Sequence, residues 1–154
     1  MVKVFFGCSM RGGYGVVDKT ELAKLPDIIE ELGYLLMSRH QTGDWQKSEA
    51  KLTNTDIHDR DYNWILGADC GIFEISNPSL GVGGEISDLV SLGKPILCLF
   101  KEGLEEQVSA YTLGKQGSKF IKTPYECHAY KSLETAKEII KRFVEKTFPI
   151  NKSE

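Results

Sequence analysis

The sequence has no long apolar run. No stretch of its 154 residues reaches the roughly 20 apolar residues that a membrane-spanning helix needs. The first ten residues, MVKVFFGCSM, carry one basic residue and an apolar run too short for the core of a secretory signal. We interpret this opening as a buried strand and predict no membrane partner.

A block of basic residues is also missing. Lys and Arg number 19 against 22 Asp and Glu, a formal net charge of -3, and they are dispersed along the chain. Proteins that bind the nucleic-acid backbone without regard to sequence concentrate positive charge. The composition therefore argues against a nucleic-acid partner. It leaves room for a small anion, which backbone amides can bind locally.

Cysteine is scarce: Cys8, Cys70, Cys98 and Cys127 form no CxxC pair. Free cysteines in strand-like runs pack as small hydrophobic residues. We predict a reducing, cytoplasmic setting, no metal site and no cofactor.

Short apolar runs alternate with helical patterns over one domain, residues 1–148, with a tail at 149–154. This alternation predicts an α/β fold of the Rossmann-like or flavodoxin-like kind, with about five mostly parallel strands and helices on both faces. The predicted strands are 2–8, 34–37, 70–75, 95–100 and a short one in SKFIKT, 118–123. The predicted helices are 20–32 with Pro26 as a kink or second start, 55–66 capped by Thr55, 85–92, 109–113 and 133–148.

Ligands of such sheets bind at the carboxyl ends of the strands, where two glycine-containing loops are expected. In the first loop, Ser9, Arg11, Gly12 and Gly13 supply a hydroxyl, a guanidinium and accessible amides, all suited to phosphate. The spacing fits neither a dinucleotide fingerprint nor a Walker loop. By itself the motif leaves phosphate binding and a plain tight turn equally open.

The second loop, SNPSLGVGGE, contains Ser79 and Gly81 and runs into a helix predicted to start at Glu85. The helix dipole favours negative charge there, so we expect Glu85 to be ionised at neutral pH. A fixed carboxylate beside a phosphate-sized pocket suits attack on a sugar carbon. Taken alone, the position is more typical of an ordinary acidic first-turn residue.

The segment TDIHDRDYNWI offers Asp56, Asp59 and Asp61 on one predicted helix. Asp61 precedes Trp64 and Ile65 by about one helical turn, so it borders the buried stripe and is the acid expected to point into a cleft. Glycoside cleavage commonly uses two carboxyl groups, about 5 Å apart when one is the nucleophile. Taken alone, each aspartate is better explained by a solvated helix face.

Three blocks, FFGCSMRGG, RDYNWILGADCGIFEISNPSLGVGGE and SLGKPILCLF, with an echo in GSKF, resemble the nucleoside 2-deoxyribosyltransferase superfamily. Within it they are most similar to the 2′-deoxynucleoside 5′-monophosphate N-hydrolases. The resemblance implies hydrolysis of a nucleoside monophosphate to free base and (deoxy)ribose 5-phosphate through a covalent glycosyl-enzyme intermediate. It implies Glu85 as the nucleophile at C1′ and Asp61 as the acid that binds the sugar and assists proton transfer. It also implies a homodimer, in which Ser118 completes the neighbouring site, and a phosphate cradle made of Ser9, Arg11, Gly12, Gly13, Ser79 and Gly81.

The chain departs from this pattern at Phe5, where the deoxynucleotide hydrolases usually carry Tyr. Loss of the hydroxyl removes a hydrogen bond and opens space, so we hypothesise either relaxed selectivity for the 2′-deoxy sugar or a preference for ribonucleotides. Met10 and His40 are predicted to lie near the base, Met10 against its flat face and His40 in a variable loop.

Three alternatives differ in chemistry. A deoxyribosyltransferase would usually act on unphosphorylated nucleosides, which the serine- and arginine-containing loop disfavours. A non-enzymatic nucleotide-binding module is disfavoured by the joint presence of Asp61 and Glu85. A phosphoribohydrolase of the cytokinin-activating kind would be expected to carry a PGGxGT run, which the chain lacks.

Overall fold

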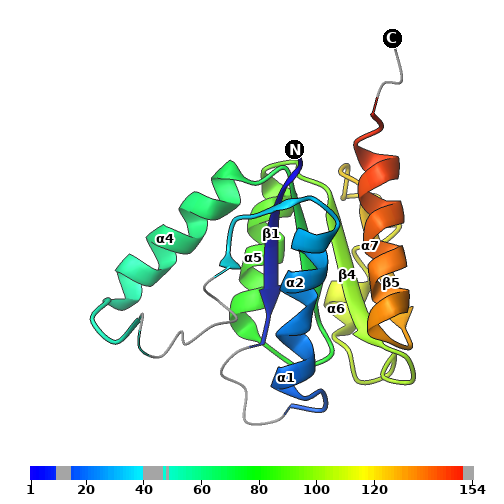
Figure 1. The fold of residues 1–154 in the computed structure, drawn as a ribbon, viewed down its shortest axis with the longest axis horizontal. Coiled ribbons are helices and arrows are strands. Elements are labelled where there is room, and N and C mark those ends of the chain that lie inside the picture. Colours follow the sequence, from blue (N-terminus) through cyan, green and yellow to red (C-terminus); the bar gives the residue numbers. More distant parts are fainter. Residues whose placement is uncertain (10–14, 40–46, 48, 151–154) are drawn as a thin grey trace.

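Five parallel strands form the centre of the computed structural model, which describes residues 1–9, 15–39, 47 and 49–150 (Figure 1). The strand order β2-β1-β3-β4-β5 is that of flavodoxin-like sheets and confirms the predicted fold class. The strands are β1 (Lys3–Cys8), β2 (Leu35–Leu36), β3 (Cys70–Glu74), β4 (Ile96–Lys101) and β5 (Tyr125–Tyr130). The helices are α1 (Lys19–Leu22), α2 (Lys24–Glu31), α4 (Asn54–Gly67), α5 (Leu80–Ser91), α6 (Ala110–Leu113) and α7 (Leu133–Thr147).

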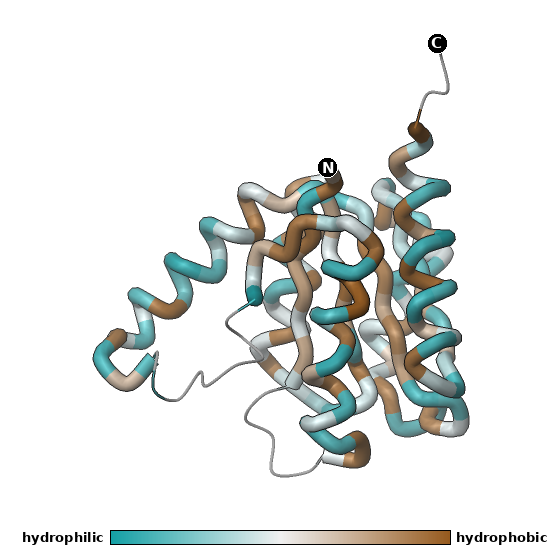
Figure 2. The backbone as a smooth tube through the Cα atoms, in the orientation of Figure 1, coloured by the Kyte–Doolittle hydropathy of each residue, from teal (hydrophilic) through white to brown (hydrophobic). Residues whose placement is uncertain are grey.

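Alternating side chains of β1 divide the core between the two faces of the sheet. Val4 and Phe6 pack on the face covered by α1, α2 and α7, whereas Phe5 packs on the face covered by α4 and α5. Figure 2 shows hydrophobic residues along the central strands and alternating hydropathy along α2 and α7. Helix α4 extends away from the sheet, and Ile65 is its fully buried side chain. Within the described ranges, no helix combines the length and apolar character needed to cross a bilayer.

Helix α5 begins at Leu80, five residues before the predicted start at Glu85. The Ser79 hydroxyl accepts a hydrogen bond from the N–H of Val82 at 3.2 Å and so caps the helix there. The glycines of the loop therefore lie inside the helix. As a result, Glu85 is in the second turn rather than at the N-terminus.

Helix α4 is capped by Thr53 rather than by the predicted Thr55. Thr53 accepts from the N–H of Asp56 at 3.1 Å, and the Asp56 carboxylate accepts from the N–H of Thr53 at 2.9 Å. This reciprocal pair is a capping box. Pro26 lies in the first turn of α2, where no intrahelical N–H bond is lost, so the predicted second start is confirmed.

The predicted strand in SKFIKT is wrong. Gly117, just before it, has a φ of 76°, and turn hydrogen bonds follow from Ser118 N–H to Lys115 O and from Ile121 N–H to Ser118 O. The fifth strand is instead Tyr125–Tyr130, which pairs in parallel with β4.

Candidate active site

The carboxyl ends of β1 and β3 lie side by side, because Cys8 pairs with Glu74 in the parallel register. The loops after these strands therefore meet at one edge of the sheet, as predicted. The buried Ser9 hydroxyl donates a hydrogen bond to the carbonyl of Pro78 at 3.2 Å. Ser9 and the helix-capping Ser79, both predicted phosphate contacts, thus belong to the same edge.

Asn77 holds the far end of the first loop. Its Oδ1 accepts from the N–H groups of Val16 at 2.7 Å and Val17 at 3.0 Å, and its Nδ2 donates to the carbonyl of Val17 at 3.0 Å. Because Ser9 is bonded to the next residue, Pro78, one short turn after β3 fixes both ends of the loop after β1. The sequence analysis did not single out Asn77.

Glu85 reaches from α5 across the end of β1 at Gly7. A Cβ added to Gly7 would lie 2.9 Å from Oε2 of Glu85 and 2.7 Å from the ring of Phe73. Both distances are too short for real contacts, so glycine is required here for the carboxylate to approach the strand. A glycine within a buried strand commonly marks such an approach, and this was the signal that could have identified Gly7.

The Glu85 carboxylate is partly buried, and no described residue donates a hydrogen bond to it. Burial raises its pKa from 4.5 to about 8, and the nearby charges of Asp61 and Asp88 add to the rise. The prediction that Glu85 is ionised at neutral pH is therefore wrong for the substrate-free protein. Because the helix starts at Leu80, its N-terminus is too far from Glu85 to offset the effect of burial on the pKa.

Asp61 lies on α4 with a side chain that is 18% exposed, and it is close enough to Glu85 for its charge to raise that residue's pKa. Burial raises the pKa of Asp61 too, while the Arg60 guanidinium opposes the rise. Arg60 donates from Nε to Oδ1 of Asp61 at 2.9 Å and from Nη2 to Oε1 of Glu49 at 2.6 Å. The charge of one predicted catalytic carboxyl group thus acts on the other, as expected if the two face a common site.

The remaining predicted contacts differ in their surroundings. The Phe5 ring is fully buried, 5.9 Å from the ring of Phe73, on the same side of β1 as Gly7. Gly81 is exposed near the start of α5. Ser118 lines a groove together with Ser87 and Val90 of α5, and neither Glu85 nor Asp61 is among the residues that line it. The predicted contacts Met10, Arg11, Gly12, Gly13 and His40 lie outside the described residues.

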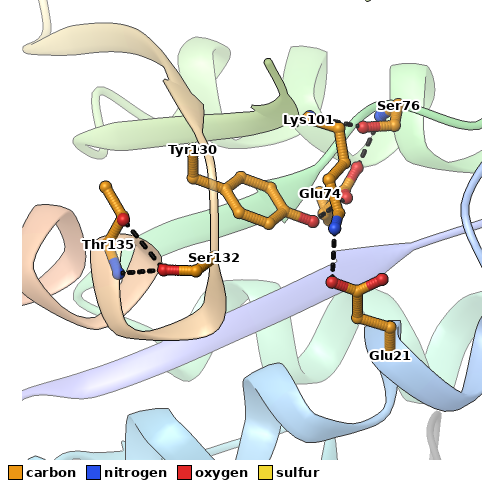
Figure 3. Close-up of polar contacts among 7 residues, drawn as sticks. All are labelled: Glu21, Glu74, Ser76, Lys101, Tyr130, Ser132 and Thr135. Atoms are coloured by element: carbon orange, nitrogen blue, oxygen red, sulfur yellow. Dashed lines mark hydrogen bonds and ion pairs between the residues drawn. The ribbon is translucent and has the colours of Figure 1, made fainter.

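A second buried carboxylate, Glu74, ends β3 at the same edge and points to the face of Tyr130, opposite to that of Phe73; Figure 3 shows its contacts. It accepts hydrogen bonds from the N–H of Ser76 and the hydroxyl of Tyr130, both at 2.5 Å. Lys101 lies beside it and forms an ion pair with Glu21. This cluster holds the ends of three strands to α1 and leaves Glu74 fully partnered.

The fold and this edge together define an α/β protein with a candidate ligand site at the carboxyl ends of its central strands. Two carboxyl groups, one of them without a hydrogen-bond donor among the described residues, suit acid–base or nucleophilic chemistry there.

Comparison with known proteins identifies the family, although no family model matches the chain. The 5-hydroxymethyl-dUMP N-hydrolase of Rattus norvegicus is 35% identical over 120 residues, 76% of this chain and 72% of that protein. A protein of Thermofilum pendens assigned as 2′-deoxynucleoside 5′-phosphate N-hydrolase 1 is 35% identical over 116 residues, 73% and 78% of the two chains. The chain belongs to this family of 2′-deoxynucleoside 5′-phosphate N-hydrolases.

Solved structures agree on the fold. The solution structure of BlsM has a TM-score of 0.67 at 20% identity and covers 99% of this chain and 97% of its own. The CMP N-glycosidase BcmB of Clostridium botulinum has a TM-score of 0.62 at 18% identity, with coverages of 92% and 98%.

Proposed function

We propose that the protein hydrolyses the N-glycosidic bond of a nucleoside 5′-monophosphate and releases the free base and a pentose 5-phosphate. Family membership supports this reaction class, because the relatives bear the names of nucleotide N-hydrolases. The observation that carries the proposal is the Glu85 carboxyl group. It has no hydrogen-bond donor among the described residues, is coupled to Asp61, and lies beside the two loops at the sheet edge.

In this mechanism the phosphate is anchored first, and its binding energy holds C1′ against Glu85. Glu85 first loses the proton that burial favours and, once ionised, attacks C1′ as the C1′–N bond breaks. The base nitrogen takes the bonding electrons and a proton. Asp61 binds the sugar and assists that proton transfer. Water then cleaves the glycosyl ester and regenerates the carboxylate. The proposed phosphate cradle is Ser9, Arg11, Gly12, Gly13, Ser79 and Gly81, and Met10 and His40 are proposed to lie near the base.

A homodimer forms part of the proposal. Ser118 lies on a groove of 500 Å³, and a second groove of 630 Å³ shares Ser87, Tyr111 and Lys115 with it. Leu80, Tyr111 and Phe120, which line these grooves, are 99%, 82% and 79% exposed and would be covered in such an interface. The free cysteines among the described residues fit the proposed reducing, cytoplasmic setting.

Subunit mixing tests the dimer. Glu85→Gln and Ser118→Ala subunits are each expected to be weakly active alone, and mixing them should restore activity, because one site then combines an intact Glu85 with an intact partner Ser118. A monomer in sedimentation, with no restoration on mixing, would contradict the shared site.

The proposed relaxed sugar selectivity rests on Phe5. The ring is fully buried two residues before Gly7 on the same side of β1, and we propose that a tyrosine hydroxyl there would contact the sugar. We expect matched ribo- and deoxyribonucleotides to be cleaved within about tenfold of each other, and Phe5→Tyr to shift the ratio several-fold toward the deoxy form, in the range of single-group discrimination. A strong deoxy preference that Phe5→Tyr leaves unchanged would refute this role.

The function itself is tested with a panel of nucleoside monophosphates assayed for free-base release, with and without a second free base. Release of base in both conditions indicates hydrolysis, whereas a new nucleotide formed only with the second base indicates a transferase. Tight binding without release by either wild type or Glu85→Gln would identify a binding module instead.

A further inference from the structure

Arg60 contacts two carboxylates: Asp61, the candidate acid beside it on α4, and Glu49, which precedes the helix. Its Nε and Nη2 both lie 2.9 Å from Oδ1 of Asp61, and Nη2 lies 2.6 Å from Oε1 of Glu49. All three side chains are largely shielded, with exposed fractions of 21%, 18% and 11% for Arg60, Asp61 and Glu49. Ion pairs at this depth are screened less than surface pairs, so their geometry has consequences.

The guanidinium of Arg60 also contacts an aromatic ring. Its central carbon lies 4.9 Å from the centroid of the Trp64 ring, a cation–π arrangement one turn along α4. Two carboxylates and a ring thus restrict its orientation. Because both bonds to Asp61 go to Oδ1, no described residue donates to Oδ2, which stays available to a ligand.

We propose that Arg60 is a positioning residue for the reaction: it fixes the Asp61 carboxylate through Oδ1, leaves Oδ2 for the sugar, and couples Asp61 to Glu49. This inference rests on the proposed function. Arg60 contacts no reacting atom in it and acts through Asp61. Lysine could supply the charge but not the planar, two-pronged geometry.

The proposed role of Arg60 can be measured through the ionisation of the two carboxyl groups. Within the described part of the chain, the groups whose charges act on Asp61 are Arg60, Glu49 and His58, and those whose charges act on Glu85 are Asp61 and Asp88. Removing the cation should make Asp61 harder to ionise, whereas removing Glu49 should make it easier to ionise. The acid limb of the kcat/KM profile belongs to the pair as a whole and should move accordingly.

The test compares Arg60→Gln, Arg60→Lys and Glu49→Gln in the full-length protein. Arg60→Gln is expected to lower kcat about tenfold or more through misplacement of Asp61 and to move the acid limb up by about one pH unit. Arg60→Lys should keep the limb near its wild-type position while kcat still falls, and Glu49→Gln should move the limb down. Lys137→Gln, which removes a lysine paired at 2.9 Å with Glu31 on the opposite face, serves as the matched control.

A lower melting temperature for Arg60→Gln with an unchanged pH profile and kcat would show a merely structural role and overturn the inference. Carboxyl carbon NMR titration of wild type, Arg60→Gln and Glu49→Gln provides a readout without turnover. Failure of the wild type to release any base would refute the proposed function, and the titration would still decide whether Arg60 and Glu49 shift Asp61 in opposite directions. Should Arg60→Gln not fold, the Arg60→Lys and Glu49→Gln shifts decide the outcome.

Discussion

Glu74 and Glu85 are two carboxyl groups at the same edge of one sheet, on opposite faces. Both are withdrawn from water, and burial raises the pKa of each. They differ in what surrounds the oxygens. Glu74 accepts from a backbone N–H and from Tyr130 and has Lys101 beside it, whereas Glu85 has no donor among the described residues and Asp61 and Asp88 nearby.

The comparison teaches that a raised pKa does not by itself identify a functional group. A buried polar group that is fully hydrogen-bonded contributes to the fold, and one that is left without partners is held at a cost that the rest of the structure must offset. Such a cost is common where a ligand supplies the missing interactions. On this criterion we assign Glu74 a structural role and propose Glu85 as the reactive group.

The largest expected effect is on turnover. Glu85→Gln should lower free-base release by about a thousandfold or more, the range seen when a nucleophile is removed. Glu74→Gln, a change of the same size and charge on the other face, should leave kcat within about tenfold of wild type, because it touches no reacting atom. Base release measured by chromatography, with circular dichroism to verify folding, checks the pair.

Equal losses of activity in the two variants would contradict the distinction between Glu74 and Glu85, because Glu74 would then take part in the chemistry. An active Glu85→Gln protein would remove the covalent mechanism altogether.

Whereas Glu85 is expected to be needed for turnover, its carboxyl group should lower the stability of the folded protein at high pH. Glu85 has a folded-state pKa of about 8 against an ordinary 4.5, so the folded state holds its proton more tightly than the unfolded state. The free energy of unfolding should therefore fall as pH rises from 4.5 through 8, by on the order of 3 kcal/mol. Glu85→Gln lacks this titration and should be more stable than wild type at pH 9, with little difference at pH 4.

Tyr130→Phe provides the contrast on the other face. It removes the hydroxyl that donates to Glu74 and should lower the free energy of unfolding by about 1–3 kcal/mol, the range for leaving a buried group unsatisfied. Urea unfolding at both pH values measures the two changes. If Glu85→Gln destabilised the protein at high pH, the carboxylate would have a stabilising partner, and the distinction drawn from hydrogen bonding would fail.

Much of the fold could be predicted because local patterns determine it. Alternating apolar runs and helical periods located β1, β3, β4, α4 and α7 to within a few residues. The errors occurred where a single residue sets the boundary of an element. Ser79 starts α5 through its hydroxyl, and Gly117 turns the chain so that the apolar residues after it are not a strand.

The candidate site was predictable as a set of chemical groups but not as an environment. Sequence spacing pointed to Asp61 and Glu85, yet the direction of the Glu85 pKa depends on burial and on Asp61, which is 24 positions away in the sequence but adjacent in space. Gly7 and Arg60 were missed for the same reason, because their importance lies in what tertiary packing places beside them.

We expect the smallest effect on activity at Asn77. Like Glu74 it is a buried polar side chain with its hydrogen bonds satisfied, but it holds the loop after β1, whose residues are proposed to bind phosphate. Asn77→Ala should raise KM about tenfold and lower kcat less, because a loosened loop weakens phosphate anchoring while Glu85 stays in place. Asn63→Ala, at an exposed position of α4, is the matched control. A fall in kcat with KM unchanged would show that Asn77 acts on the reacting carbon rather than on the anchor. Satisfied hydrogen bonds would then no longer separate the groups that position substrate from the group that attacks it.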